Sequence, residues 1–275
     1  MINTFIYTEA TKVVDQKLNC IQSIQDAYQP DAIFLLGTKH NQYKTESIFS
    51  ALSNEGTFIS QLFLLVLIPK PEKYTILEMH EMMERKASNI LPTTCILLET
   101  STFIHWCSIG HSFAVKVVNS STPVYCNNQY ANSFQIHVES EMNANLLQRT
   151  YREGLEKSNE FFSGAELYLI RKQYQLSLFM LHQAAEQALS TFIKMGLGYY
   201  IPIHNVERLL RYAGWTNHAV SCIFPLKSEE DKRVFKLFQR SYIDSRYNPE
   251  FTVKYCDLIV LRDKVSELLN QLKML

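Results

Sequence analysis

The sequence predicts an α+β protein in which a mixed α/β domain, residues 1–142, precedes an all-α up-and-down helical bundle, residues 143–275. Apolar runs typical of buried strands occur in the first half, whereas the second half consists of amphipathic segments with helical spacing. The charge also changes sign: residues 1–143 carry 9 Lys and Arg against 13 Asp and Glu, and the remaining residues carry 18 against 14. A length of 275 residues suits two domains.

The strands of the first half are predicted from short apolar runs. Three such runs are long enough for buried strands, at residues 32–36, 62–68 and 95–98. The first is followed by Gly37, a residue typical of turns. Residues 122–126 predict a late strand at a sheet edge, because Pro123 cannot donate a hydrogen bond to a neighbouring strand.

The helices of the first half are predicted from apolar residues three and four apart. This spacing predicts helices over residues 8–28, 74–89 and 101–110. Residues 113–118 either continue the helical pattern or begin a strand.

Helical patterns fill the second half. They predict five helices, over residues 144–170, 176–194, 206–213, 228–247 and 252–275. Ser228 is a suitable N-cap and is followed by three acidic residues that complement the helix dipole. Gly196 and Gly198 are suited to end the second helix. The domain boundary is predicted near residues 140–144.

Two segments of the first half, residues 33–39 and 60–67, are similar to the minimal nucleotidyltransferase pattern. The resemblance implies a strand ending near Gly37 and a following strand that begins with two aspartates one residue apart. Carboxylates at such positions point to one face of a strand, where they hold the divalent ions of the reaction. This chain has Gln61 and Phe63 there. The resemblance therefore implies a degenerate domain that does not transfer nucleotides.

A degenerate nucleotidyltransferase-like domain can still hold a nucleotide through its backbone. The residues that the resemblance assigns to this role are Gly37, Thr38 and Lys39. The same Gly is equally suited to a simple turn after a strand.

Polar residues one helical turn apart interrupt two apolar helices of the second half. His182 and Glu186 share a flank of one apolar stripe, and Tyr242 and Arg246 are spaced likewise near the end of another predicted helix. These segments, together with a third that opens at His204, resemble the HEPN family of nucleotide- and RNA-associated helical bundles over roughly residues 150–270.

The ribonucleases of the HEPN family carry a His four to six residues after an Arg, and the pair acts without a metal ion. Proton transfer near neutral pH needs a group such as imidazole. No His follows Arg246, so a ribonuclease would need His182 or His204 from elsewhere in the fold.

The resemblance assigns ligand contact to six residues of the bundle, namely His182, Glu186, Tyr242, Asp244, Arg246 and Tyr247. The alternative is structural, because a satisfied polar network inside a bundle fixes helix register without any ligand.

The sequence therefore predicts a HEPN-type protein that binds a nucleotide or RNA without catalysis, in a toxin–antitoxin or stress-response system. A metal-independent ribonuclease that uses Arg246 and a protein-interaction module without a nucleotide ligand are the alternatives. A homodimer and a partner protein are expected by family analogy. No cofactor, no metal and no membrane span are expected. Six scattered cysteines without a Cys-x-x-Cys motif favour reduced thiols in the cytoplasm.

Overall fold

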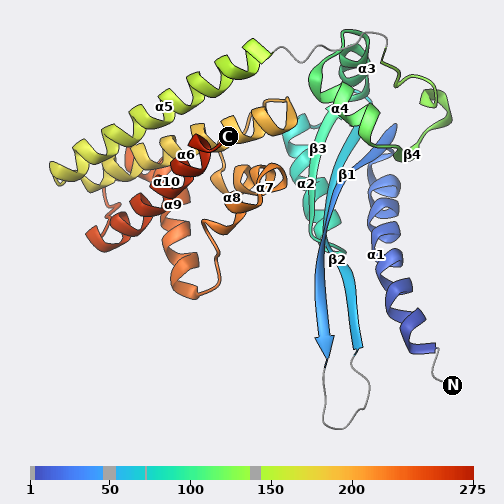
Figure 1. The fold of residues 1–275 in the computed structure, drawn as a ribbon, viewed down its shortest axis with the longest axis horizontal. Coiled ribbons are helices and arrows are strands. Elements are labelled where there is room, and N and C mark those ends of the chain that lie inside the picture. The colour runs from blue at the N-terminus through green and yellow to red at the C-terminus, as the bar shows by residue number, and fades with distance from the viewer. Residues whose placement is uncertain (1–3, 46–53, 72, 137–143) are drawn as a thin grey trace. The chain divides into compact units, whose positions relative to one another are not determined.

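The computed structural model describes residues 4–45, 54–71, 73–136 and 144–275. The chain divides into two compact units, Met1–Glu141 and Met142–Leu275 (Figure 1). The first unit contains a mixed sheet with helices, and the described part of the second is built from helices. The predicted α+β class, with a mixed α/β region followed by a helical region, is confirmed.

A four-stranded sheet forms the centre of the N-terminal unit, in the order β3-β2-β1-β4. Its strands are β1 (Ala32–Thr45), β2 (Asn54–Ile68), β3 (Thr93–Glu99) and β4 (Pro123–Cys126). The pairs β1–β2 and β1–β4 are antiparallel, and β2–β3 is parallel. Strand β4 lies at an edge, as Pro123 predicted.

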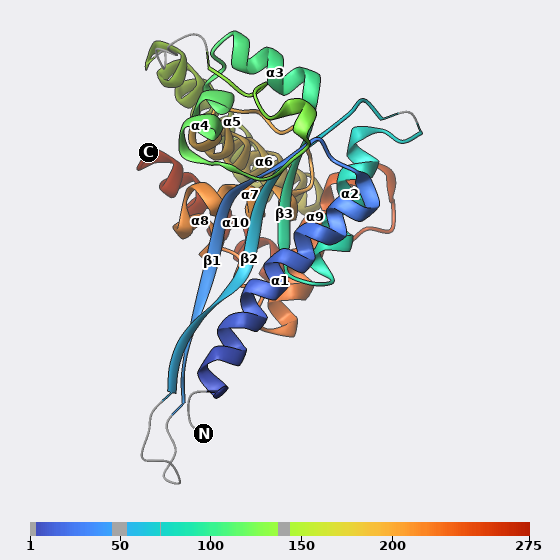
Figure 2. The same cartoon turned by 90° about the vertical axis from the view of Figure 1, so that its right-hand side faces the viewer.

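Helices cover both faces of the sheet, which explains why residues 32–35 of β1 and 62–68 of β2 are apolar without alternation. On one face, α1 (Thr4–Tyr28) and α2 (Ile76–Ser88) pack over alternate residues of the strands (Figure 2). Toward the other face, rings of α3 (Thr100–Ser108) and α4 (Ser112–Ser120) join a cluster with Phe34 of β1. The short 3₁₀ helix η1 (Asn128–Tyr130) follows β4.

The structure corrects the predicted end of the first strand and decides the conformation of residues 113–118. The first strand does not end before Gly37 but continues to Thr45, because β2 begins at Asn54 and supplies partners along this length. Gly37 lies at an irregularity in this pairing rather than in a turn. The sequence left two possibilities for residues 113–118, a helix or a strand, and these residues belong to the helix α4.

The C-terminal unit contains six helices in its described residues. They are α5 (Ala144–Ile170), α6 (Tyr174–Leu197), α7 (Val206–Thr216), α8 (His218–Cys222), α9 (Glu229–Tyr247) and α10 (Tyr255–Lys273). The Ser228 hydroxyl accepts a hydrogen bond from the Asp231 backbone N–H, which confirms the predicted N-cap of α9. Gly198 ends α6 in the left-handed conformation, at φ 76°.

Helix α6 is the central helix of this unit. It contacts α5, α7, α9 and α10, so that most of its circumference is covered. Polar residues of α6 are consequently buried among neighbouring helices, and this positions the candidate site. Within the part of the chain that the structure describes, no helix is both long and apolar enough to cross a membrane.

Candidate ligand site of the helical unit

The polar pair of α6 is buried. The exposed fraction is 1% for His182 and 6% for Glu186, although both interrupt an apolar helix. Since burial of a polar group costs free energy unless it is hydrogen-bonded, such residues require partners. Gln183 supplies one, because its amide Nε2 lies 3.4 Å from Glu186 Oε2.

His204, between α6 and α7, supplies the principal partner of Glu186. Its Nδ1 lies 2.9 Å from Glu186 Oε1. A carboxylate only accepts hydrogen bonds, so the Nδ1–H of His204 donates this one. The His204 side chain is 61% exposed, in contrast to its carboxylate partner at 7%. With Nδ1 engaged, Nε2 is the ring nitrogen that a ligand can use.

His182 is held neutral inside the bundle. Burial, followed by the nearby charges of His204 and Arg246, lowers the pKa of His182 to about 4. Its Nδ1 lies 3.9 Å from Glu186 Oε2, but a neutral imidazole forms no ion pair at neutral pH. Its ring packs between aromatic residues of α9, with ring centroids 5.5 Å from Phe238 and 5.3 Å from Tyr242.

Tyr242 joins the buried and exposed parts of the site. The ring of His204 is nearly parallel to it, at an interplanar angle of 6° and a centroid distance of 5.9 Å. The guanidinium carbon of Arg246 lies 4.4 Å from the centroid of the same ring, a cation–π contact. His204 and Arg246, 42 residues apart in sequence, are thus brought to one tyrosine.

The guanidinium of Arg246 is held by rings and by backbone. Its Nε donates a hydrogen bond of 2.8 Å to the Tyr242 carbonyl, and its Cζ lies 5.0 Å from the centroid of the Tyr247 ring. Among the residues that the structure describes, no carboxylate pairs with Arg246. Its charge is therefore open to an anionic ligand, and Tyr247, at 73% exposure, presents a ring beside it.

Asp244 is not brought into this cluster. Its carboxylate pairs with Arg240, at 2.7 Å from Nη2, one turn earlier on α9. Asp244 was predicted to contact the ligand because it lies within the same motif, but residues two positions apart on a helix point in different directions. The six bundle residues named from sequence thus divide into a buried pair, an exposed group around Tyr242, and Asp244 apart from both.

The N-terminal candidates lie within a strand. Gly37, Thr38 and Lys39 pair with Phe63, Leu62 and Gln61 of β2. The hydroxyl of Thr38 lies 2.9 Å from Nε2 of His40. The turn that would present backbone N–H groups to a phosphate is absent at these residues, since the strand continues. Phe63 is 3% exposed and belongs to the core, whereas Gln61 is exposed.

Comparison with known proteins supports the assignment of the helical unit. Residues 151–275 match the family model described as HEPN domain, which confirms the resemblance stated from the sequence. No curated protein matches the chain. Among solved structures, a nucleotidyltransferase-like protein from Exiguobacterium sibiricum 255-15 aligns at 14% identity, with a TM-score of 0.30. The alignment covers 91% of this chain and 74% of that protein. At the level of the family, the HEPN match supports a nucleotide- or RNA-related function.

Proposed function

We propose, from the premise that residues 151–275 form a HEPN domain, that this domain binds RNA or a nucleotide on the exposed side of the Tyr242 cluster without cleaving it. The cluster consists of His204, Tyr242, Arg246 and Tyr247. The observation that carries the proposal is the exposed Arg246 guanidinium, which has no carboxylate partner among the described residues and lies against the same ring as His204.

Each exposed member of the Tyr242 cluster suits one part of a nucleotide. A guanidinium matches the geometry of a phosphate group and binds it with two parallel hydrogen bonds. The exposed ring of Tyr247 offers a face on which a base can stack. His204 is held by the buried Glu186, so its outer ring nitrogen is oriented before a ligand arrives.

The test is the binding of a fluorescently labelled single-stranded RNA, and separately of a labelled nucleotide, followed by anisotropy. Arg246→Met keeps much of the apolar contact with Tyr242 but removes the charge. We expect at least about tenfold weaker binding, with the salt dependence reduced by about one counterion. Arg240→Met on the same helix is the matched control, because Arg240 is already paired with Asp244. Equal loss in both variants, or no binding by the unaltered protein, would contradict the proposal.

A metal-independent ribonuclease is the second candidate, and the Glu186–His204 contact favours it. A carboxylate that orients an imidazole is a common arrangement for acid–base catalysis, and Arg246 would stabilise charge on the phosphate. Cleavage of single-stranded RNA in the presence of a chelator tests this. The activity should be lost in His204→Gln and Arg246→Met, and retained in His218→Gln. A protein without cleavage that still binds RNA supports the first candidate.

The third candidate is a protein-interaction module without a nucleotide ligand. In this case the buried His182–Glu186 pair would serve only to fix the packing of α6 against α9. Calorimetry that is silent against a panel of nucleotides and RNA, with the fold intact, would support this candidate over the other two.

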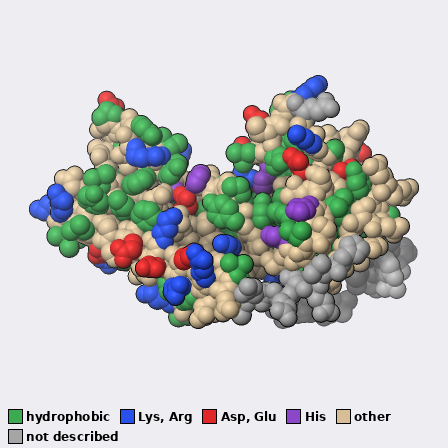
Figure 3. Space-filling model, turned by 90° about the horizontal axis from the view of Figure 1, so that it is seen from above, with side chains coloured by type: hydrophobic (Ala, Val, Ile, Leu, Met, Phe, Trp, Pro, Cys, Tyr) green, Lys and Arg blue, Asp and Glu red, His purple; other side chains and the backbone are tan. Residues whose placement is uncertain are grey.

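A homodimer formed through an apolar face is part of the proposal. Apolar side chains gather on the surface of the C-terminal unit in Figure 3. The last turn of α5 also exposes two apolar residues, Leu167 and Ile170. The larger exposed fraction of the two is 77%, at Ile170. Exposed apolar patches of this kind are typical of protein interfaces.

The cellular setting that we propose is the bacterial cytoplasm, in a toxin–antitoxin or stress-response system with a partner protein. None of the six cysteines forms a disulfide in the structure, which suits a reducing compartment. Native mass measurement on protein isolated from its own host tests this part, because it reports the oligomeric state, a retained small molecule and a bound partner together.

A further inference from the structure

A cavity of about 280 Å³ lies between the first turns of α9 and α10 and the segment that joins α8 to α9. Its walls are largely apolar, formed by Phe224, Val234, Phe235, Val260 and Leu261. The volume suits a molecule of the size of a substituted benzene ring. The Tyr242 cluster lies at the opposite end of α9, since Arg246 belongs to its last turn.

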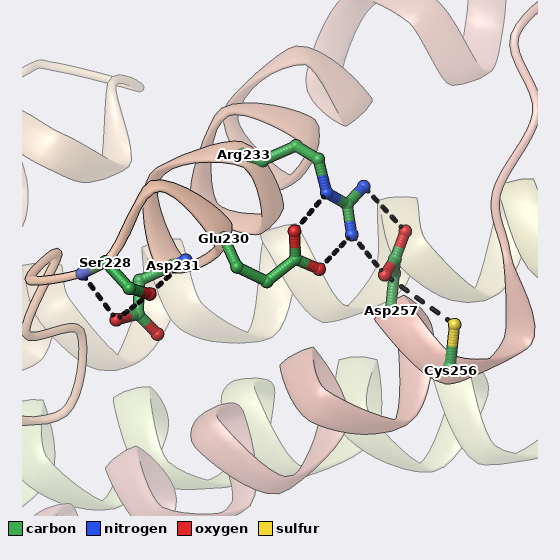
Figure 4. Close-up of polar contacts among 6 residues, drawn as sticks. All are labelled: Ser228, Glu230, Asp231, Arg233, Cys256 and Asp257. Atoms are coloured by element: carbon green, nitrogen blue, oxygen red, sulfur yellow. Dashed lines mark hydrogen bonds and ion pairs between the residues drawn. The ribbon is translucent and has the colours of Figure 1, made fainter.

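Three charged residues at this cavity, Glu230, Arg233 and Asp257, are paired with one another. Arg233 bridges α9 to α10: its Nη2 lies 2.6 Å from Glu230 Oε1 and 2.6 Å from Asp257 Oδ1, and its Nη1 lies 3.0 Å from Asp257 Oδ2 (Figure 4). Asp257 is only 5% exposed, so this bridge satisfies a buried carboxylate. The guanidinium of Arg233 lowers the pKa of Asp257 and keeps it ionised.

The remaining charged groups of the lining are also engaged. One carboxylate oxygen of Asp231 accepts hydrogen bonds from the hydroxyl and the backbone N–H of Ser228, in the capping box of α9. The Lys264 ammonium donates a hydrogen bond of 2.8 Å to the Ile223 carbonyl and lies 5.5 Å from the centroid of the Phe224 ring. An anionic ligand would lie among the carboxylates of Glu230, Asp231 and Asp257, and a cationic ligand would compete with Arg233 and Ser228 for these carboxylates, so a charge on the ligand is unfavourable.

We infer that this cavity binds a small, neutral, largely apolar molecule with an aromatic ring and at most one hydroxyl group. Burial of the ring against the contacting pair Phe224 and Phe235, whose centroids are 5.2 Å apart, and against the aliphatic walls provides the affinity. The charged rim can form hydrogen bonds with a hydroxyl group, because Lys264 and the carboxylates keep unused hydrogen-bonding capacity. Binding at this cavity does not depend on the proposed RNA site, because the Tyr242 cluster lies at the other end of α9.

The test compares three probes that share one ring, using the full chain: benzyl alcohol, benzylamine and phenylacetate. Binding is measured from methyl chemical shifts of Val234, Val260 and Leu261 during titration. We expect benzyl alcohol to shift these methyl signals, and the two charged probes to bind at least about tenfold more weakly. A charged probe that binds as tightly as the alcohol, or the absence of binding by all three, would overturn the inference.

Cavity-filling variants locate the bound probe. Val260→Trp places a large ring in the lining, and Val260 is 45% exposed, so that the ring can be accommodated without disrupting the core. We expect this variant to lose benzyl alcohol binding at least tenfold. Ile243→Trp, on α9 outside the cavity and 58% exposed, is the control and should bind normally. If Val260→Trp does not fold, Val260→Phe serves as the cavity-filling variant in its place. Undiminished binding in a folded filling variant would also overturn the inference.

Discussion

Acidification should destabilise the helical unit through His182. The pKa of this residue is about 4 in the folded protein, because the side chain is buried, and 6.5 is the ordinary value that applies to the unfolded chain. A folded-state pKa below the unfolded one means that unfolding takes up a proton at intermediate pH. The stability associated with neutral His182 is therefore complete above pH 6.5 and is lost as the pH falls toward 4.

The magnitude follows from the two pKa values. The free energy of unfolding should fall by about 2 kcal/mol between pH 7 and pH 5, and by about 3 kcal/mol in total once the pH is below 4. With an exposed fraction of 1%, His182 gains little from screening by solvent, so this contribution is not reduced further. Such a loss is a large share of the stability of a typical domain.

The assay is urea unfolding at pH 7 and pH 5, in a Trp106→Phe background. Trp215 is then the only tryptophan, so its fluorescence reports on α7 in the helical unit. His182→Gln should lose about 2 kcal/mol of the pH dependence, whereas His218→Gln, at an exposed position, should keep the full dependence. Direct titration of the histidine ring signals by NMR gives the pKa of His182 without a mutation. A value near 6.5, or an unchanged pH dependence in His182→Gln, would refute the reasoning.

Three further predictions concern other parts of the molecule. Arg233→Met should lower the melting temperature of the helical unit at pH 7, because it leaves the buried carboxylate of Asp257 without its counter-charge. Since the pKa of Asp257 is lowered in the folded protein, the difference in melting temperature between wild type and variant should shrink as the pH falls below about 4. A difference in melting temperature that does not change with pH would contradict this. Ile170→Glu should shift the proposed homodimer to monomer in light scattering without loss of helicity by circular dichroism, and an unchanged dimer would place the interface elsewhere. With magnesium and labelled nucleoside triphosphates, the protein should transfer no label to protein or RNA; transfer that disappears in Lys39→Ala would show that the N-terminal unit is active.

The elements that were predicted well are those whose signals are local. Five of the six helices described in the second half follow from apolar spacing, whereas the short helix α8 was not predicted. The end of α6 follows from Gly198 and the start of α9 from Ser228. Capping and left-handed termination depend on residues close in sequence, so one segment contains the necessary information. The length of β1 was not predictable in this way, because the strand continues past Gly37 only where β2 pairs with it.

The candidate site likewise has features that the sequence determines and features that depend on the tertiary structure. The sequence determined which residue types were available, including the missing His after Arg246 and the missing carboxylates at Gln61 and Phe63. Only the tertiary structure decided that His204 bonds to Glu186, that Arg246 lies on Tyr242, and that Asp244 turns to Arg240.

The physical reason is that hydrophobic spacing and helix caps act within a few residues, whereas burial and pairing of polar groups depend on which helices meet. Composition determined that this chain could hold an imidazole, a guanidinium and a carboxylate in one bundle. The packing of α6 against α7 and α9 decided which of them is buried and neutral, and which is left exposed for a ligand.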